Sequence, residues 1–398
     1  MTMTVYVPSA LFGIGEGAIA PVVAIVASHL GASVALASLV VGMMGIGRVL
    51  GDVPAGMLAQ RIGDRRTMLC SVMVSIVSLG ICLLAVDVWM LALGAAGTGV
   101  ARAAFGLARH TYITEVIPYS LRARALSTLG GIQRAGLFVG PMCGGAAIAL
   151  MGTSGAFWVA MASSVLAGIV LIVVSAPEEH RTAEAHDAST ARVLREHLPV
   201  FRTLGTSAML AGIIRASRQV VIPLWGNHIG LDPAVISVIF GLSGAIDMLL
   251  FYPSGLLMDR AGRNWVAVPS MVVLGIAHFL LPLTGTTLGL GAVALLIGFG
   301  NGMSAGVIAT VGSDASPDVG RAAFLGAWRL CADFGTAVGP LLIGAIAATT
   351  SLAPAIFAMG AIGGVSAAAW ARWIPRHTKE PPPPGAVADQ AGPTAESD

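Results

Sequence analysis

The sequence predicts an all-α membrane protein with twelve transmembrane helices in two parallel six-helix halves. Three observations predict this fold: an apolar composition, twelve long apolar runs, and an internal repeat that extends from end to end. The 398 residues are 56% hydrophobic and only 11% charged, whereas about a quarter of the residues in an ordinary soluble domain are charged. We therefore expect the chain to lie in a lipid bilayer.

The apolar runs each approach the ~20 residues that cross a hydrocarbon core as a helix. Backbone groups in lipid have no water to bond, so runs of this length must be helical, whereas a barrel would show short alternating segments. The first run lacks a basic leader and a cleavage site, so we expect it to remain as the first span. The runs are 5–27, 37–59, 67–86, 90–112, 125–148, 155–175, 204–226, 235–257, 265–283, 289–311, 324–347 and 354–372.

The basic residues of the loops alternate along the chain. Arginines follow the even-numbered runs, whereas the intervening loops contain no Lys or Arg: 29–36, 87–89, 149–154, 227–234, 284–288 and 348–353. Lys and Arg are retained on the cytoplasmic side during membrane insertion. We therefore expect a multi-pass protein of the cell (inner or plasma) membrane with both termini in the cytoplasm.

One offset of 199 residues aligns the chain with itself without a gap, for example His29 with His228 and Pro54 with Pro253. Six helices separate the two copies, so both copies enter the membrane from the same side. Parallel halves that rock around a midplane site are typical of transporters. The predicted parts are an N-terminal half (1–176), a polar cytoplasmic linker (177–202), a C-terminal half (203–373) and a disordered cytoplasmic tail (374–398).

The loops after the second and eighth runs carry the same motif, at Gly56, Arg61, Gly63 and Arg65 and again at Gly255, Asp259, Arg260, Gly262 and Arg263. Both resemble the signature loop of the major facilitator superfamily, Gly-x-Leu-x-Asp-Arg-x-Gly-Arg-Arg. The resemblance implies that family's twelve-helix fold and a transport function. The first copy departs from the pattern at Gln60 and Asp64, which weakens the charge relay that the resemblance implies between the second and eleventh helices.

The fifth run carries a glycine motif made of Gly136, Gly140, Pro141, Gly144 and Gly145. This motif is similar to one associated with the drug/proton antiporter branch of the family. Two interpretations stay open, a specific antiport role and simple close packing of helices through small residues. Arg102, in the fourth run, resembles the buried arginine that the family links to proton coupling.

Several charges fall inside the apolar runs, where each costs about 2.5 to 3.5 kcal/mol and needs a partner. The 199-residue offset equates three such positions and reverses the charge at each: Glu16 with Arg215, Arg48 with Asp247, and Arg134 with Asp333. In the family arrangement the second helix packs against the eleventh and the fifth against the eighth. The resemblance therefore implies the inter-half pairs Arg48 with Asp333 and Arg134 with Asp247.

Asp52 and Arg329 lie one turn from the first of these pairs and would form a second rung between the halves. A different pairing stays equally open, within each helix at a spacing of four residues: Arg48 with Asp52, and Arg329 with Asp333. Both arrangements relieve the same desolvation cost.

The helices expected to line the cavity are the first, fourth, seventh and tenth, and their polar side chains include Glu16, Arg102, Arg109, Arg215, Arg218 and Asn301. Glu16 with Arg102 is the candidate proton-coupling pair, since burial and a nearby arginine act in opposite directions on the protonation of a carboxyl group. A permanent ion pair that only fixes two helices is the alternative. Arg215 and Arg218 form a positive wall for an anionic or zwitterionic substrate, or serve Glu16 alone.

We expect a secondary transporter that works by alternating access, as a proton antiporter exporting small amphipathic solutes. Proton-coupled uptake of a small metabolite and a non-transporting membrane sensor are the alternatives. The expected partners are a small-molecule substrate, protons and the lipid bilayer, with no nucleic acid, metal or cofactor, and the chain is expected to be a monomer. An enzyme is not expected, because the sequence contains no clustered catalytic set and no phosphate-binding Gly-x-x-x-x-Gly-Lys-Ser/Thr loop.

Overall fold

A computed structural model describes residues 5–117, 119–174, 195–317 and 320–377, and its regular elements are all helices. The N-terminal half contains α1 (Val7–Ile19), α2 (Val23–His29), α3 (Val34–Ile62), α4 (Asp64–Leu83), α5 (Val88–Val116), α6 (Tyr119–Met151) and α7 (Ser154–Val173). The C-terminal half contains α9 (Leu198–Val200), η2 (Phe201–Gly205), α10 (Thr206–His228), α11 (Pro233–Ala261), α12 (Asn264–Leu280), η3 (Leu281–Leu283), α13 (Thr287–Ser304), α14 (Val307–Asp314), α15 (Arg321–Thr349) and α16 (Leu352–His377).

The helices confirm the predicted fold class of an all-α membrane protein. Eleven helical spans in the described part of the chain are long and apolar enough to cross a membrane, with α1 and α2 forming one span and α13 and α14 another. The twelfth is α10, whose 23 residues are also long enough. Arg215 and Arg218 on α10 lower its hydropathy, so the seventh span is recognised by its place in the repeat rather than by its composition.

The 199-residue repeat of the sequence recurs in the helix boundaries. Helices α3 and α11 have 29 residues each and are related by the offset at both ends. The caps recur as well, since Ser33 and Asp232 cap the starts of α3 and α11, accepting hydrogen bonds from Leu36 N at 3.3 Å and Ala234 N at 2.7 Å respectively. Each half therefore folds from the same local signals.

The two signature loops turn at equivalent glycines. Gly63 and Gly262 have φ angles of 86° and 96°, in a region that a residue with a Cβ atom rarely adopts. Both glycines end a long helix, α3 or α11, and the next helix starts immediately after the turn. The tight turn explains why the motif keeps glycine at this place in both copies.

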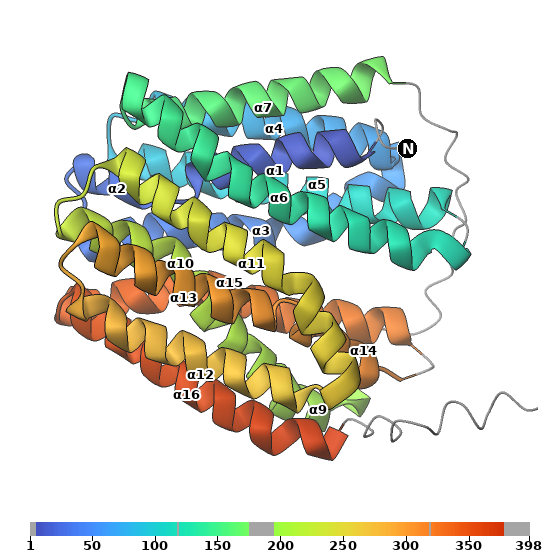
Figure 1. Ribbon diagram of the computed structural model, residues 1–398. Coiled ribbons are helices and arrows are strands. Elements are labelled where there is room, and N and C mark those ends of the chain that lie inside the picture. Colours follow the sequence, from blue (N-terminus) through green and yellow to red (C-terminus); the bar gives the residue numbers. More distant parts are fainter. Residues whose placement is uncertain (1–4, 118, 175–194, 318–319, 378–398) are drawn as a thin grey trace, which may run out of the picture.

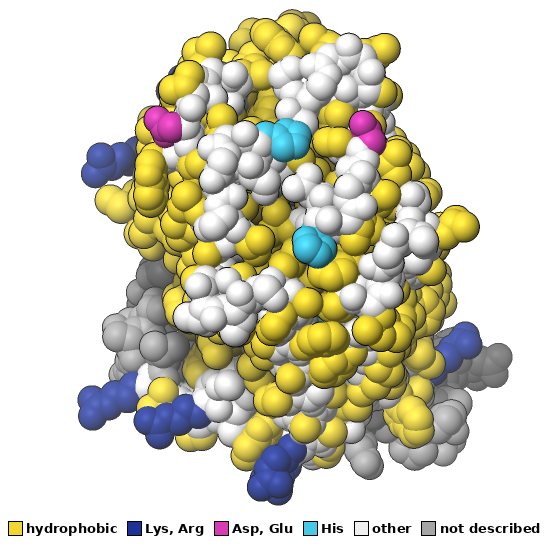
Figure 2. Space-filling model, turned by 90° about the vertical axis from the view of Figure 1, so that its left-hand side faces the viewer, with side chains coloured by type: hydrophobic (Ala, Val, Ile, Leu, Met, Phe, Trp, Pro, Cys, Tyr) yellow, Lys and Arg dark blue, Asp and Glu magenta, His cyan; other side chains and the backbone are white. Residues whose placement is uncertain are grey.

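Both halves begin and end at one end of the bundle, which we call the linker side. In Figure 1, α1 begins and α7 and α16 end on the right, and this is the linker side. Figure 2 views the opposite side, where acidic and histidine side chains lie within the outline and the basic side chains in view protrude at its rim. The predicted linker falls partly on residues 175–194, and residues 378–398 of the predicted tail also lie outside the described residues. Helix α16 continues past Trp373 to His377.

The two halves meet mainly through α3 with α15 and through α6 with α11, which is the arrangement that the family resemblance implies. Small residues bring the backbones close: a Cβ atom on Gly344 of α15 would lie 3.2 Å from the Ser38 side chain, and one on Gly45 of α3 would lie 2.7 Å from the Cα atom of Ala337. These contacts run from the side opposite the linker toward the middle of the bundle. The halves are therefore packed tightly on that side.

Candidate functional site

A cavity lies between the halves in the middle of the bundle. Its walls come from α1, α3 and α5 of the first half and from α10 and α15 of the second. It contains about 500 Å³ of atom-free space, including the part that opens to solvent. The lining residues are Glu16, Ile19, Val41, Met44, Gly45, Arg48, Thr98, Gly99, Arg102, Gln219, Thr336 and Pro340.

Glu16 and Arg102 face each other in the wall of this cavity. Arg102 Nε lies 3.4 Å from Glu16 Oε1, and the two side chains are 29% and 13% exposed. The structure thus brings together the two residues that the sequence analysis selects for proton coupling. Because both groups reach the cavity, substrate and solvent can approach the pair.

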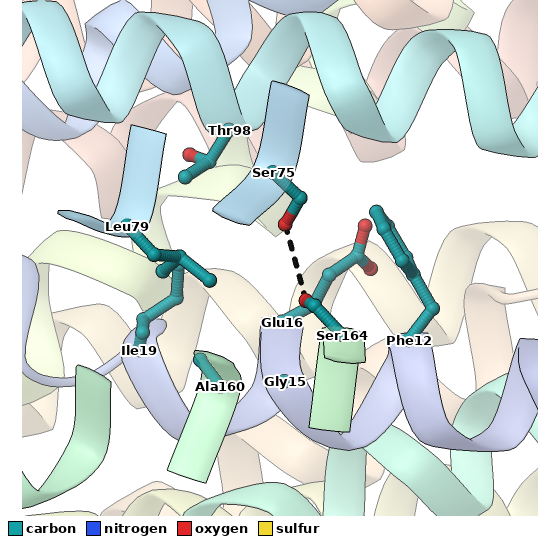
Figure 3. Close-up of a pocket in the computed structure, with 9 residues that line it drawn as sticks. All are labelled: Phe12, Gly15, Glu16, Ile19, Ser75, Leu79, Thr98, Ala160 and Ser164. Atoms are coloured by element: carbon teal, nitrogen blue, oxygen red, sulfur yellow. Dashed lines mark hydrogen bonds between the residues drawn. The ribbon is translucent and has the colours of Figure 1, made fainter. Parts of the chain in front are cut away.

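Glu16 also borders a second, smaller cavity inside the N-terminal half. Figure 3 shows its carboxyl group beside Phe12, with Ser75 of α4 and Ser164 of α7 close by. The two hydroxyl oxygens lie 3.2 Å apart in a hydrogen bond, and Thr98 lines both this cavity and the one between the halves. Glu16 therefore sits in the wall that separates the two cavities.

The glycine motif of α6 holds the helix that carries Glu16. A Cβ atom on Gly136 would lie 2.8 Å from the carbonyl carbon of Gly13, and one on Gly144 would lie 3.2 Å from the Cα atom of Ala18. A Cβ atom on Gly140 would lie closer still, against the carbonyl oxygen of Ile14 and 2.7 Å from the backbone nitrogen of Ala18. The motif thus packs α1 against α6 along the turns on either side of Glu16.

The remaining two motif residues face the other half. A Cβ atom on Gly241 of α11 would lie 3.2 Å from Pro141, and one on Gly145 would lie 3.2 Å from the carbonyl oxygen of Ala234. The geometry therefore accounts for every motif position by close packing, either with the helix that bears Glu16 or across the inter-half boundary.

Two ion pairs join the halves in the middle of the bundle. Arg48 Nη2 lies 3.0 Å from Asp333 Oδ1, between α3 and α15. Arg134 Nη1 lies 2.9 Å from Asp247 Oδ1, between α6 and α11. The repeat relates one contact to the other with the charges exchanged. We call these two ion pairs the inter-half latches.

The structure contains part of each pairing that the sequence leaves open for Asp52 and Arg329. Arg329 Nε lies 3.4 Å from Asp333 Oδ2 on its own helix, so Asp333 binds one arginine across the boundary and one within α15. Asp52 has no ion pair within the described residues, either with Arg48 or with Arg329. The expected second rung between the halves is therefore absent, because Arg329 turns to the carboxylate that is already in place.

The C-terminal half presents two arginines from α10. Arg218 Nη1 lies 3.5 Å from Asp247 Oδ2, so Asp247 binds Arg218 as well as Arg134. Arg215 donates from Nη1 to the carbonyl oxygen of Ser304 at 3.3 Å. Neither arginine contacts Glu16, which is paired with Arg102. Asn301 is buried on α13, and its Oδ1 atom has no hydrogen-bond partner in the described structure.

Arg109 makes no ion pair with these groups within the described residues, although Glu16 and Arg102 lie within electrostatic range of it. Its Nη2 donates to Gln133 Oε1 at 2.6 Å, and its Nε is buried without a hydrogen-bond partner among the described residues. The sequence places Arg109 among the cavity residues, whereas the structure places it between α5 and α6, 5% exposed. Its role in this structure is to join these two helices through Gln133.

The family model described as the Major Facilitator Superfamily matches residues 6–217 and again residues 204–396. The two matches together cover nearly the whole chain and overlap at residues 204–217, at the start of the C-terminal half. The chain belongs to the Major Facilitator Superfamily. This superfamily consists of membrane transporters, and the predicted fold and the predicted family are both confirmed. The antiporter branch is not distinguished by this match.

Two curated superfamily members resemble part of the chain. Both are uncharacterized MFS-type transporters of Mycobacterium tuberculosis, from two strains, and both are 28% identical to this chain over 145 residues. That region is 36% of this chain and 21% of each relative. The chain therefore spans about a fifth of the length of the curated relatives that it matches.

Solved superfamily structures share the whole fold at low identity. A bacterial homolog of the human lysosomal transporter Spinster, in an inward-facing and unoccupied conformation, has a TM-score of 0.76 at 14% identity and covers 95% of this chain and 98% of its own. The nucleoside transporter NupG gives 0.72 at 14%, with coverages of 93% and 98%. A D-xylose-proton symporter gives 0.72 at 14%, with coverages of 96% and 98%.

The two superfamily signature loops use their arginines differently. Arg65 donates to the carbonyl oxygens that end α7, including Leu171 at 2.6 Å and Val174 at 2.9 Å. Arg263 instead binds two carboxylates, with Nε 3.0 Å from Asp314 Oδ2 and Nη1 3.2 Å from Asp259 Oδ1. Arg65 thus caps the end of α7, and Arg263 links α11 to α14 through their carboxylates.

Several polar residues at or near the site are not identified by the sequence analysis. Gln219 and Thr336 line the cavity, but neither carries the charge that marks a residue in an apolar run. His278 is fully buried on α12, and its Nε2 lies 2.6 Å from Ser217 Oγ. A histidine in the middle of a predicted span is a signal that could have been used, because polar groups at this depth need a partner.

Proposed function

We propose that this superfamily member is a proton-coupled antiporter that exports small amphipathic solutes by alternating access. The observation that carries the proposal is the Glu16–Arg102 ion pair in the wall of the inter-half cavity. A carboxyl group in this position can release its proton while paired with arginine and accept one when the pair is broken. Substrate and proton can then compete for the same site.

Alternating access requires two states of similar free energy, each held by its own contacts. Close glycine packing holds the halves together on the side opposite the linker, and the two latches join them in the middle of the bundle. Rocking would exchange these contacts for contacts on the linker side. We propose that the linker side is cytoplasmic, because the loops on the opposite side contain no Lys or Arg. The described state then opens its cavity toward the cytoplasm, from which an exported substrate must enter.

Proton-driven uptake is the second candidate. The fold is shared with a D-xylose-proton symporter and with a nucleoside transporter, and the same latches would serve transport in either direction. Antiport is favoured by one sequence feature, the similarity of the α6 glycine motif to the motif of the antiporter branch. The packing of this motif along α1 is compatible with either direction of transport.

The proposal is tested in proteoliposomes with an imposed pH gradient and a screen of small solutes. We expect Glu16→Gln and Arg102→Ala to abolish proton-coupled flux while the purified proteins stay folded. Arg372→Gln, on the exposed end of α16, is the control for loss of an arginine charge and should transport normally. Undiminished proton coupling in both site variants would remove the assignment of Glu16 and Arg102. If the solute moves across the membrane in the same direction as the protons instead of in the opposite direction, the protein is an uptake transporter.

A further inference from the structure

The repeat gives the C-terminal half its own version of the Glu16–Arg102 site. The 199-residue offset equates Glu16 with Arg215 and Arg102 with Asn301. The first half therefore holds an acid with a base, and the second half holds a base with an amide. The second copy of the site has an arginine and no carboxylate of its own.

The contacts of Arg215 show that no carboxylate from elsewhere in the described residues forms an ion pair with it. The structure gives Arg215 one hydrogen bond, to the carbonyl oxygen of Ser304 at 3.3 Å, and no ion pair within the described residues. Its neighbours Arg134 and Arg218 already share Asp247, and all three of these groups lie within electrostatic range of Arg215. Three guanidinium groups thus surround a single carboxylate.

The same excess holds for the whole middle of the bundle. Among the described residues, seven arginines (Arg48, Arg102, Arg109, Arg134, Arg215, Arg218 and Arg329) face four carboxylates (Glu16, Asp52, Asp247 and Asp333), which leaves three uncompensated positive charges. Charges at this depth are costly unless they are paired. An anion is therefore the ligand that this interior lacks.

A second, independent observation marks the position of that ligand. Asn301 is 3% exposed, and its side-chain Oδ1 has no hydrogen-bond partner in the described structure. A buried polar atom without a partner is rare in a native protein and calls for an explanation. Arg215 reaches the same stretch of α13, since it binds the carbonyl oxygen of Ser304, three residues after Asn301. Because Oδ1 is an acceptor, the ligand that satisfies it must carry a donor, such as a hydroxyl or ammonium group, in addition to the anionic group that Arg215 lacks.

The site is accessible from the cavity. Arg215 lies one helical turn before Gln219 on α10, and residues four apart share one face of a helix. Gln219 lines the inter-half cavity, so Arg215 faces the same space one turn nearer the linker side. The side chain of Arg215 is half-buried rather than closed off.

We propose that Arg215 and Asn301 form the substrate-binding site of this transporter, and that its substrate is a small organic carboxylate. Arginine presents a planar fork that matches a carboxylate group in two parallel hydrogen bonds. Asn301 Oδ1 then accepts a hydrogen bond from a hydroxyl or ammonium group near the carboxylate of the ligand. The bound anion also competes with Asp247 for Arg134 and Arg218, which weakens one inter-half latch and links binding to rocking. This inference rests on the proposed transport function and specifies its substrate class.

The test measures thermal unfolding of the purified full chain in detergent, with glycolate, lactate and mandelate as probes, since each carries a hydroxyl donor beside its carboxylate. Their uncharged amides, at the same ionic strength in sodium chloride, are the matched controls. We expect at least one carboxylate, and none of the amides, to raise the Tm of the wild-type protein by about 1 to 2 °C or more. Arg215→Gln should abolish this shift, and Arg372→Gln should retain it.

The ligand-free variants give a result that does not depend on the choice of probe. Because Arg215 is an unpaired charge, Arg215→Gln should raise the Tm of the ligand-free protein, whereas removal of a paired arginine should lower it. A lower Tm for Arg215→Gln would overturn the proposal, as would equal responses to carboxylates and amides. Proton-coupled transport of uncharged or cationic solutes would overturn only this substrate class, whereas carboxylate binding without proton-coupled flux would overturn only the proposed function.

Discussion

Removal of the Asp333 carboxylate should open the side of the bundle opposite the linker. Asp333 is the acceptor of one inter-half latch, and the change Asp333→Asn leaves Arg48 without its partner 3.0 Å away. The Arg48 and Asp333 side chains are 22% and 10% exposed, so the pair lies between a surface ion pair and a fully buried one. Exposed pairs contribute about 0 to 1 kcal/mol, and breaking a buried pair costs about 3 to 5 kcal/mol.

An intermediate value of about 2 kcal/mol fits this partly buried pair. Each 1.4 kcal/mol changes an equilibrium constant by about tenfold, so the ratio of the open to the closed state should rise by about 30-fold. In the Asp333→Asn variant, the asparagine oxygen stays within reach of Arg329 on the same helix. The loss of the Arg329 ion pair adds little to the free-energy change, because the Arg329 side chain is 46% exposed.

A cysteine at position 38 reports this change. Ser38 is fully buried on α3, where it packs against α15 near Gly344 on the side that the latch holds closed. Ser38→Cys is introduced after the four native cysteines are replaced, and the rate of its reaction with a polar maleimide is measured in nanodiscs. The Asp333→Asn variant should react about 30-fold faster, by the estimate above. Asp87→Asn, which keeps a capping side chain at the start of α5, should change the rate by less than about twofold.

A second variant separates the latch from stability. Combining Arg48→Gln with Asp333→Asn removes the unpaired buried charge, so the Tm should recover toward the wild-type value while the labelling rate stays high. A labelling rate in Asp333→Asn within about threefold of the wild-type rate would refute the assignment of this ion pair as a latch, because the predicted shift of the equilibrium would be missing.

Three further substitutions, with Gly80→Ala as a control, test a helix contact, a turn and a helix cap. Gly140→Val should prevent transport and lower the Tm, since any Cβ atom at this place overlaps the backbone of α1; normal transport would contradict the tight contact. Gly63→Ala should cost about 1 to 3 kcal/mol because φ is 86°, whereas Gly80→Ala, in a helix with open space around it, should be neutral or stabilising in the same Tm assay. Arg65→Gln should increase hydrogen exchange at the end of α7, whose carbonyl oxygens it binds, and unchanged exchange there would exclude the capping role.

The fold could be predicted because its signals are local and occur twice. The Ser33 and Asp232 caps and the Gly63 and Gly262 turns set the same helix boundaries in both halves. The breaks within spans are harder to predict from the sequence. The first span divides into α1 and α2 around Pro21, whereas its counterpart α10 runs without a break through its own proline, Pro223. A proline permits a break in a helix, but packing against the neighbouring helices decides whether the break occurs.

The site could be predicted as far as charge demands a partner. The charge reversal and the implied helix arrangement predict Asp333 as one of two possible partners of Arg48, and Asp52 on the same helix as the other. The structure selects Asp333 for Arg48, and it also pairs Arg329 with Asp333. Asp333 lies four residues after Arg329 on the same helix, and Asp52 lies on the facing helix of the other half. The sequence alone therefore allows Arg329 to pair with either carboxylate. The placement of Arg109 with Gln133 was hidden for a similar reason, since a neutral partner leaves no signal in a count of charges.

The direction of the charge reversals has a consequence for assembly. At the latches the N-terminal half supplies both arginines, Arg48 and Arg134, and the C-terminal half supplies both carboxylates, Asp247 and Asp333. If two N-terminal halves met through the same surfaces, the repeat would place Arg48 of one against Arg134 of the other, and two C-terminal halves would oppose Asp247 and Asp333. Like charges brought together in a partly buried contact are unfavourable. The pattern therefore favours contact between an N-terminal and a C-terminal half over contact between two identical halves. Two halves with identical charges at these positions would have no such preference.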